Sequence, residues 1–311
     1  MRVVFMGTPA FAVPSLSALV TAGHSVEFVI TQPDRPVGRK QTLTPPPVKV
    51  RATELGLSVF QPRRVKSADS FQKLQGIAPD VIVVVGYGQI IPQRILDLPP
   101  HGCINVHASL LPKYRGAAPI NWAIANGETK TGVTTMKLVF KLDAGDMLLK
   151  CDTLIGPEET AEQLFERLAP MGAELLIETL AGLEAGNIVA EPQKEDEATF
   201  APILKREEGE IDWNLEASRI YDRLRGFTPW PGVYTYFRDR RLQIHRAQAL
   251  DEAGQGPGRV STQGGRLRVG CGESSSLAVD EVQTEGKKRI AASDFVRGYR
   301  PEEGELLGER K

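Results

Sequence analysis

The uninterrupted β-branched run Val81–Val85 is the feature that most limits how this chain can fold. A short run of this kind is typical of a β-strand, and because it has no polar position, both faces of the strand must be covered. A central strand of a parallel sheet with helices on either side meets that condition. The run is also far shorter than the roughly 20 residues that a transmembrane helix needs, so no membrane span is expected.

Similar short apolar stretches alternate with helix-like segments over about the first 190 residues. Further strands are expected at Val3–Met6, Val26–Thr31, Cys103–Val106 and Val133–Val139, and helices at Pro14–Gly23 and over residues 160–186. Thr160 and Gln163 have the spacing of a capping box at the start of the second helix, and Pro170 should kink or split it. The alternation predicts a Rossmann-like α/β domain with a mainly parallel sheet.

The pattern changes near residue 190. Residues 190–208 contain 3 basic and 6 acidic residues and two prolines, which predicts a linker between domains. One helix, at about Leu215–Arg225, and several short strands separated by glycine-rich turns follow it. This pattern predicts a small antiparallel, OB-like β-barrel. The expected organisation is therefore a first domain over 1–189, a linker over 190–208 and a second domain over 209–311.

Composition and charge indicate an ordinary globular protein. The net charge is −1, but residues 209–300 carry 15 basic against 12 acidic side chains, a weak surplus that permits an anionic partner. Cys103, Cys151 and Cys271 match no disulfide or metal-ligand spacing, so no metal site is expected. Met1–Arg2 leads directly into an apolar strand with no secretory leader pattern. We therefore expect a monomer in the cytoplasm.

Asn105, His107 and Asp143 are the candidate catalytic residues. Side chains two residues apart on a strand share a face, so Asn105 and His107 should point to the same side, into the crevice at the carboxyl ends of the sheet. Asp143 lies in the loop after the strand expected to end near Val139. An amide, an imidazole and a carboxylate suit acyl transfer from a bound donor. Since no G-x-S-x-G or Cys/His signature is present, we expect direct transfer without a covalent acyl-enzyme.

Each of these features also has a simpler interpretation. An Asn-x-His pair can hold loops at the end of a strand, and Asp-Ala-Gly-Asp is commonly a solvated turn. Gly7-Thr8-Pro9 follows the first strand as in a dinucleotide-binding fold, but G-x-G-x-x-G is absent, so bound NAD or FAD is rejected. His24, His101 and His245 are interpreted as structural.

Longer segments resemble the methionyl-tRNA formyltransferase family. They are Phe5–Pro14, Cys103–Ile120, Leu142–Met147 and, in the second half, Arg225–Gly232. The resemblance implies formyl transfer from 10-formyltetrahydrofolate to the α-amino group of methionyl initiator tRNA, for translation initiation. It implies that Asn105 and a protonated His107 stabilise the formyl oxygen. Asp143 then accepts the amine proton or orients the imidazole.

The resemblance also implies binding residues. The folate-contacting positions are Ser109, Leu110, Leu111, Pro112, Gly86, Tyr87, Gly88 and Ile90. Arg35, Arg39 and Lys40 belong to a basic, proline-rich loop that would contact tRNA phosphates, although Gln41 and Thr42 stand where more lysine is expected. Read alone, such a loop is usually a solvated connector. A second set of basic residues lies in the C-terminal domain: Arg238, Arg240, Arg241, Arg246, Arg266, Arg268, Lys287, Lys288 and Arg289.

Three other functions remain compatible with the residues. The same chemistry could formylate a small amine, such as glycinamide ribonucleotide or an amino sugar, although the C-terminal domain argues against it. With water as the acceptor, the triad would hydrolyse 10-formyltetrahydrofolate. A non-catalytic RNA-binding protein is the third alternative, and the intact triad argues against it.

Overall fold

The computed structural model describes residues 1–38 and 40–309, which fall into two compact units. The first unit comprises Met1–Pro119, Lys130–Leu154 and Phe165–Ala201. The second comprises Ile120–Thr129, Ile155–Leu164 and the residues from Pro202 onward. Two short excursions of the chain thus pack with the C-terminal unit before the chain finally enters it.

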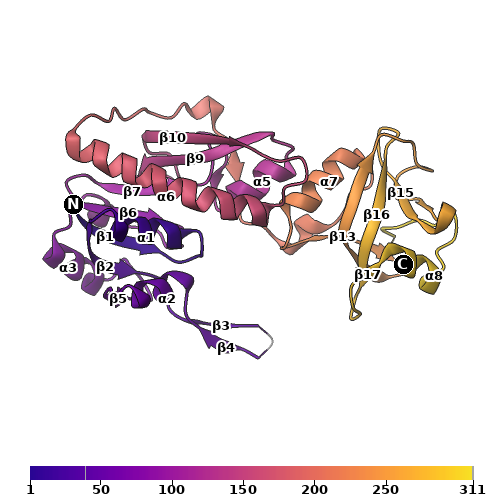
Figure 1. The fold of residues 1–311 in the computed structure, drawn as a ribbon, viewed down its shortest axis with the longest axis horizontal. Helices are drawn as coiled ribbons and strands as arrows, with labels where there is room; N and C mark the ends of the chain where they lie inside the picture. Colours follow the sequence, from indigo (N-terminus) through magenta and orange to yellow (C-terminus); the bar gives the residue numbers. More distant parts are fainter. Residues whose placement is uncertain (39, 310–311) are drawn as a thin grey trace. The chain divides into compact units, whose positions relative to one another are not determined.

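A seven-stranded sheet forms the centre of the first unit (Figure 1). Its strands, in spatial order, are β10 (Met147–Leu154), β9 (Lys130–Lys137), β7 (Cys103–His107), β6 (Val81–Val85), β1 (Arg2–Gly7), β2 (Ser25–Ile30) and β5 (Val59–Phe60). The strands from β7 to β5 run parallel, whereas β9 and β10 are antiparallel. The expected Rossmann-like, mainly parallel sheet is confirmed, with an antiparallel hairpin at one edge.

Helices cover both faces of this sheet. The bounds are α1 (Ala12–Thr21), α2 (Pro47–Glu54), α3 (Ala68–Ile77), α4 (Gln93–Leu96) and α6 (Ala161–Ala185). On one face, Leu74 of α3 and Ile95 of α4 share a buried cluster with Met6 and Ile82. On the other face, α6 lies so close to the sheet that a side chain at Gly172 would meet Val106 and Val133. β6 is fully buried between these two layers, as its sequence requires.

Helix α6 runs unbroken through Pro170 for 25 residues, so the proline does not split it. Leu168, Leu176 and Leu180 are fully buried. Burial of each contributes about 1.5–3 kcal/mol, which together exceeds the roughly 3 kcal/mol cost of an interior proline. The predicted capping box also forms, because the Thr160 N–H donates to Gln163 Oε1 at 2.9 Å and the Gln163 N–H donates to Thr160 Oγ1 at 3.4 Å.

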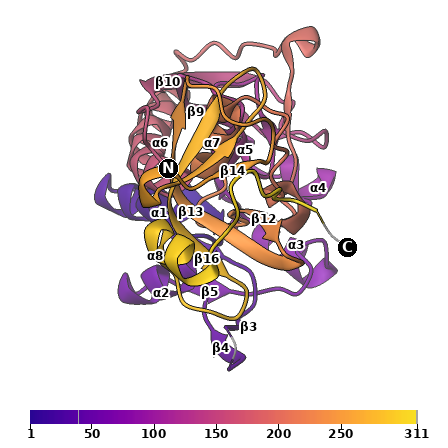
Figure 2. The same ribbon diagram turned by 90° about the vertical axis from the view of Figure 1, so that its right-hand side faces the viewer.

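An antiparallel sheet forms the second unit (Figure 2). Its strands, in order, are β12 (Val233–Phe237), β13 (Arg240–Leu250), β16 (Ser276–Thr284), β15 (Leu267–Gly270) and β14 (Val260–Ser261), with β17 (Ile290–Ala291) paired to β16. Helices α7 (Ala217–Gly226) and α8 (Ala292–Tyr299) pack against it. Among the described residues the outer strands β12 and β14 do not pair, so the expected barrel is an open half-barrel.

The remaining elements are short. β3 (Arg35–Val37) and β4 (Thr42–Thr44) form a hairpin, and β8 (Arg115–Gly116) pairs with β11 (Phe200–Ala201). Helix α5 (Pro119–Ala125) precedes β9, and 3-10 turns occupy Glu195–Glu197, Arg206–Gly209 and Gln263–Gly265. Within the described chain, no helix combines the length and the apolar character that crossing a bilayer requires.

Candidate active site

Asn105 and His107 lie on one face of β7, as the alternation of the strand predicts. That face also carries Cys103, which belongs to the buried cluster under α3 and α4. Both polar side chains are almost buried, with 8% and 6% exposed. The Asn105 amide makes no hydrogen bond within the described part of the chain, and Asn105 is flanked in the sheet by Val84 and Met136. Since no internal partner holds it, the Asn105 amide can donate to a bound molecule.

The hydrogen bond of His107 fixes the proton on its ring. Nε2 lies 2.9 Å from the carbonyl oxygen of Tyr114. Because a carbonyl oxygen can only accept, Nε2 must carry a proton and donate it. Nδ1 is then the nitrogen that can take up or release a proton. It faces Oδ2 of Asp143 at 3.8 Å, too far for a direct hydrogen bond.

Asp143 reaches the imidazole from the loop that joins β9 to β10. Its Oδ2 accepts a 2.8 Å hydrogen bond from the Gly116 N–H. Both Asp143 (φ +45°) and Tyr114 (φ +61°) have left-handed backbones, which cost about 1–2 kcal/mol for residues with a Cβ. The surrounding hydrogen bonds therefore hold these two residues in strained positions, as is common at functional sites.

Residues 112–118 cross the site and are themselves held by residues 191–201. The Tyr114 N–H donates to Thr199 Oγ1 and the Arg115 N–H to the Thr199 carbonyl, both at 2.9 Å. A side chain at Gly116 (φ +123°) would lie 2.6 Å from the Ala201 carbonyl oxygen, so only glycine allows this approach. Thr199 was not predicted as a site residue, because its segment is charged and aperiodic.

The first predicted folate segment, Ser109–Pro112, is anchored mainly through its backbone. The Ser109 hydroxyl is fully buried and donates to the Lys113 carbonyl at 2.6 Å. The Thr134 hydroxyl donates to the Ser109 carbonyl and accepts from the Leu111 N–H. Leu111 is buried beside Met136, whereas Leu110 and Pro112 remain half-buried. Leu110 and Pro112 are thus the side chains of this segment most accessible to a ligand.

The second predicted folate segment follows β6. Gly86 (φ +56°) and Gly88 (φ +83°) have left-handed backbones on either side of Tyr87. The Tyr87 side chain is buried in the core, which raises its pKa to about 12, and its carbonyl accepts from Thr8 Oγ1 and Gln32 Nε2. Ile90, in contrast, is 78% exposed. The loop therefore presents glycine backbone and Ile90 outward, while Tyr87 anchors it.

Arg35 and Lys40, two of the residues predicted to contact tRNA, lie on the β3–β4 hairpin, which projects from the sheet domain in Figure 1. Arg35 is exposed and donates to Gln32 Oε1 at 3.3 Å, and Lys40 is exposed at the turn. Arg39 lies outside the described residues. The structure does not place the hairpin against the triad residues.

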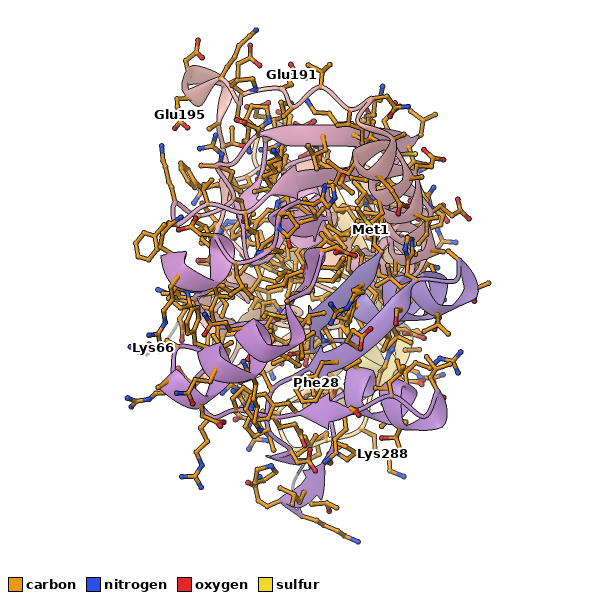
Figure 3. All side chains as sticks on the ribbon, turned by 90° about the vertical axis from the view of Figure 1, so that its left-hand side faces the viewer. Met1, Phe28, Lys66, Glu191, Glu195 and Lys288 are labelled. Atoms are coloured by element: carbon orange, nitrogen blue, oxygen red, sulfur yellow. The ribbon has the colours of Figure 1, made fainter. Side chains whose placement is uncertain are left out.

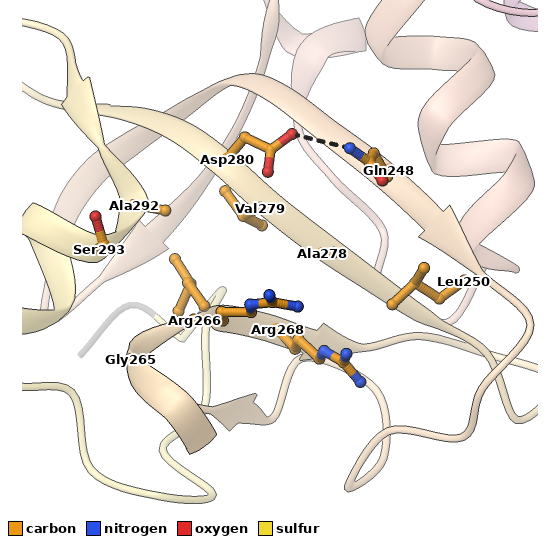
Figure 4. A pocket seen from close by; sticks show the side chains of 11 residues that line it. Gln248, Leu250, Gly265, Arg266, Arg268, Ala278, Val279, Asp280, Ala292 and Ser293 are labelled. Carbon is orange, nitrogen blue, oxygen red and sulfur yellow. Dashed lines mark hydrogen bonds between the residues drawn. The ribbon is translucent and has the colours of Figure 1, made fainter.

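The predicted basic residues of the second unit divide into paired and unpaired cations. Arg238, Arg246, Arg268 and Arg289 form ion pairs with acidic side chains. Within residues 1–38 and 40–309, no carboxylate pairs with Arg240, Arg241, Arg266, Lys287 or Lys288, and Arg241 instead lies over the Tyr234 ring. Arg266 and Arg268 line a cavity of about 430 Å³ beside β15 and β16, with Asp280 and Ser293 also on its wall (Figure 4).

Comparison with known proteins identifies the protein family to which the chain belongs. The family described as "Formyl transferase" matches residues 1–180, and "Formyl transferase, C-terminal domain" matches residues 203–300. The chain belongs to the formyl transferase family.

Close relatives narrow the class further. The chain is 57% identical over 309 residues to the methionyl-tRNA formyltransferase of Koribacter versatilis, covering 99% of both chains. It is 56% identical over 310 residues to that of Solibacter usitatus, again covering 99% of both. A solved N-formyltransferase from Helicobacter canadensis, in complex with folinic acid and dTDP-3-aminofucose, shares the fold. Its TM-score is 0.68 at 15% identity, covering 91% of this chain and 99% of that one.

Proposed function

We propose that this chain transfers the formyl group of 10-formyltetrahydrofolate to the α-amino group of methionyl initiator tRNA. The observation that carries the proposal is the 57% identity to a methionyl-tRNA formyltransferase over 99% of both chains. This similarity extends over the C-terminal unit as well. The product, N-formylmethionyl-tRNA, serves translation initiation.

The chemistry requires charge stabilisation at the formyl oxygen. The methionyl amine attacks the formyl carbon and forms a new C–N bond, and the bond from that carbon to N10 of the folate then breaks. The amine loses a proton and N10 gains one. Negative charge develops on the formyl oxygen, where the unpaired Asn105 amide and, on a protonated ring, the Nδ1–H of His107 would donate. Each donor of this kind is typically worth about 10²–10³ in rate.

The amine must also lose a proton, and Asp143 is proposed to receive it. The Gly116 N–H occupies part of the hydrogen-bonding capacity of Oδ2 and fixes the carboxylate. A carboxylate can accept about four hydrogen bonds, so capacity remains for the amine. The 3.8 Å separation from Nδ1 makes it a neighbour of the group that stabilises the oxygen. We propose general-base catalysis as the role of Asp143, with orientation of His107 as a consequence.

Separate sets of residues are proposed to bind the folate and the tRNA. Ser109–Pro112 and the segment of Gly86, Tyr87, Gly88 and Ile90 are proposed to hold the folate, through backbone groups and the exposed Ile90. Arg35, Arg39 and Lys40 are proposed to contact tRNA phosphates, supported by the exposed β3–β4 hairpin. The unpaired cations of the second unit are proposed to do the same.

We further propose that the protein acts as a monomer in the cytoplasm and that its chemistry requires no metal ion. All three triad side chains come from the first unit of one chain, which supports a site that a single copy completes. We propose that residues 1–189 and 209–311 are the catalytic and tRNA-binding domains. The segment 190–208 joins them, although its first part also packs on the catalytic loops.

The decisive experiment is a formylation assay with 10-formyltetrahydrofolate, with and without methionyl initiator tRNA. We expect formylmethionyl-tRNA with the wild type and a loss of at least about 10²-fold with His107→Ala. Steady formate release without a tRNA product would instead indicate a hydrolase. If neither product forms, the tRNA acceptor is wrong, and amino-sugar and ribonucleotide amines become the candidates.

A further inference from the structure

We propose that Gln193 is a positioning residue for formyl transfer, which holds the Asp143 loop in its working position from the segment 191–201, here called the strap. The inference rests on the function proposed above. The strap looks like part of an interdomain linker in the sequence, yet residues 191–201 belong to the first unit and lie over its catalytic loops. Figure 3 shows Glu191 and Glu195 marking its course at the surface.

Gln193 directs its side-chain hydrogen bonds to the two segments that carry the site. Its Nε2 donates to the carbonyl oxygens of Asp143 and Gly145, each at 2.8 Å. Its Oε1 accepts from Nε of Arg115 at 2.9 Å. Arg115 lies between Tyr114, whose carbonyl accepts from His107, and Gly116, whose N–H donates to Asp143. One amide therefore links the backbone of the Asp143 loop to a side chain of the segment that contacts His107.

An ion-pair cluster fastens the strap beside Gln193. The Arg115 guanidinium is buried and reaches both carboxylate oxygens of Glu195 at 3.2 Å. Glu195 also accepts from Lys141 of the Asp143 loop at 2.7 Å, and these contacts lower the pKa of the Glu195 carboxyl group. A buried guanidinium needs acceptors, so Arg115 holds the strap in place. The strap is thus attached to the crossing segment and to the loop at the same point.

The backbone of the strap is secured at both ends. Glu191 and Met147 exchange two hydrogen bonds of 2.8 Å at one end. Ala201 accepts from the N–H groups of Ala117 and Ala118 at the other. With its ends fixed in this way, the strap should stay bound when the Gln193 side chain is changed. Removing that side chain would then free chiefly the Asp143 loop, whose left-handed Asp143 must be held against strain.

The test compares Gln193→Met with the wild type in the formylation assay. Methionine has a similar length but cannot donate to the loop carbonyls. A displacement of about 1 Å at a reacting group can cost about 10²-fold in rate, so we expect kcat to fall about 10- to 100-fold. The KM values for the folate and for tRNA should change by no more than about 2-fold, and Tm only slightly. Gln193→Glu, which keeps an acceptor for Arg115 but lacks the donors, should show the same loss.

A double-mutant cycle identifies the route of the effect. If Gln193 acts through Asp143, Gln193→Met should cost little further activity in an Asp143→Asn background. The matched control is Lys194→Met, since Lys194 is the exposed neighbour in the strap and pairs with Glu197 of the same segment. It should leave kcat unchanged.

Three outcomes would overturn the proposal. The first is an unchanged kcat in both Gln193 variants, and the second is fully additive losses of activity in the double-mutant cycle. The third is a lowered Tm together with a wild-type kcat at temperatures below that Tm. Failure of the proposed function is distinguishable from these results. A wild type that releases formate without formylating tRNA refutes that function, whereas the Gln193 effect can still be measured on formate release.

Discussion

At the scale of single residues, Asn105 allows the stability and the proposed catalytic role of one side chain to be tested separately. Its amide is nearly buried and has no hydrogen-bond partner in the described chain. Asn105→Leu, of similar size, should change the free energy of unfolding by less than about 0.5 kcal/mol, because no hydrogen bond within the described chain is lost. It should also lower kcat about 10²–10³-fold through loss of the donor to the formyl oxygen. Urea denaturation and the formylation assay measure the two effects.

Asn121→Leu supplies the contrast. The Asn121 amide donates to the Gly226 carbonyl at 2.8 Å, so its loss should decrease stability by about 1 kcal/mol and leave kcat intact. A loss of stability in Asn105→Leu of the same size would mean that its amide is satisfied in solution.

At the scale of secondary-structure elements, helix ends follow local rules that a variant can test. Helix α3 ends at Ala78, an exposed residue with a left-handed backbone (φ +48°, ψ +62°). Glycine adopts this conformation without strain, so Ala78→Gly should raise the free energy of unfolding by up to about 1 kcal/mol. Gly23, after α1, has φ +79° and open space around it, so the expected effect there is the reverse. Gly23→Ala should lower the free energy of unfolding by a similar amount. Changes of equal sign in urea denaturation would contradict the argument.

The elements also show where sequence reasoning succeeds. Val81–Val85 is the strand β6 with unchanged bounds, and Cys103–Val106 forms all but the last residue of β7. Both are marked by local apolar patterns bounded by turns. The strap had no such pattern, because its order comes from hydrogen bonds to segments about 50 to 80 residues away. Such contacts leave no periodic trace in the chain.

At the scale of the whole molecule, the shifted pKa values predict a bounded range of maximum stability. Burial lowers the pKa of His24 and His245, so the unfolded state binds more protons and stability falls as the pH drops below about 6.5. The pKa values of Asp34, through a hydrogen bond from Gln61, and Glu305, through one from Arg238, are also lowered. Their stabilisation is present above about pH 4 and is lost as the pH falls through the folded-state values.

At alkaline pH, the raised pKa values of buried groups make stability fall as the pH rises. Burial raises the pKa values of Tyr87, Cys103 and Cys271 to about 12, so these groups ionise first in the unfolded state. Stability should therefore decline as the pH rises above about 8.5–10. Urea denaturation from pH 4 to 10 should give a plateau between about pH 7 and 8.5. A maximum near pH 5, or a rise above pH 9, would refute the assignment of these shifts.

The sequence by itself determined the layered α/β domain and the shared face of Asn105 and His107, because strand periodicity and apolar runs are local properties. It also named Asp143 as a candidate from its place in the loop after a predicted strand, and the resemblance to a family supported that choice. Tertiary structure alone decided that Asp143 Oδ2 lies 3.8 Å from His107, that Tyr114 fixes the ring proton, and that Gln193 holds the loop. The physical reason is that each of these contacts joins segments whose approach depends on the packing of the whole unit. No stretch of neighbouring residues encodes that packing.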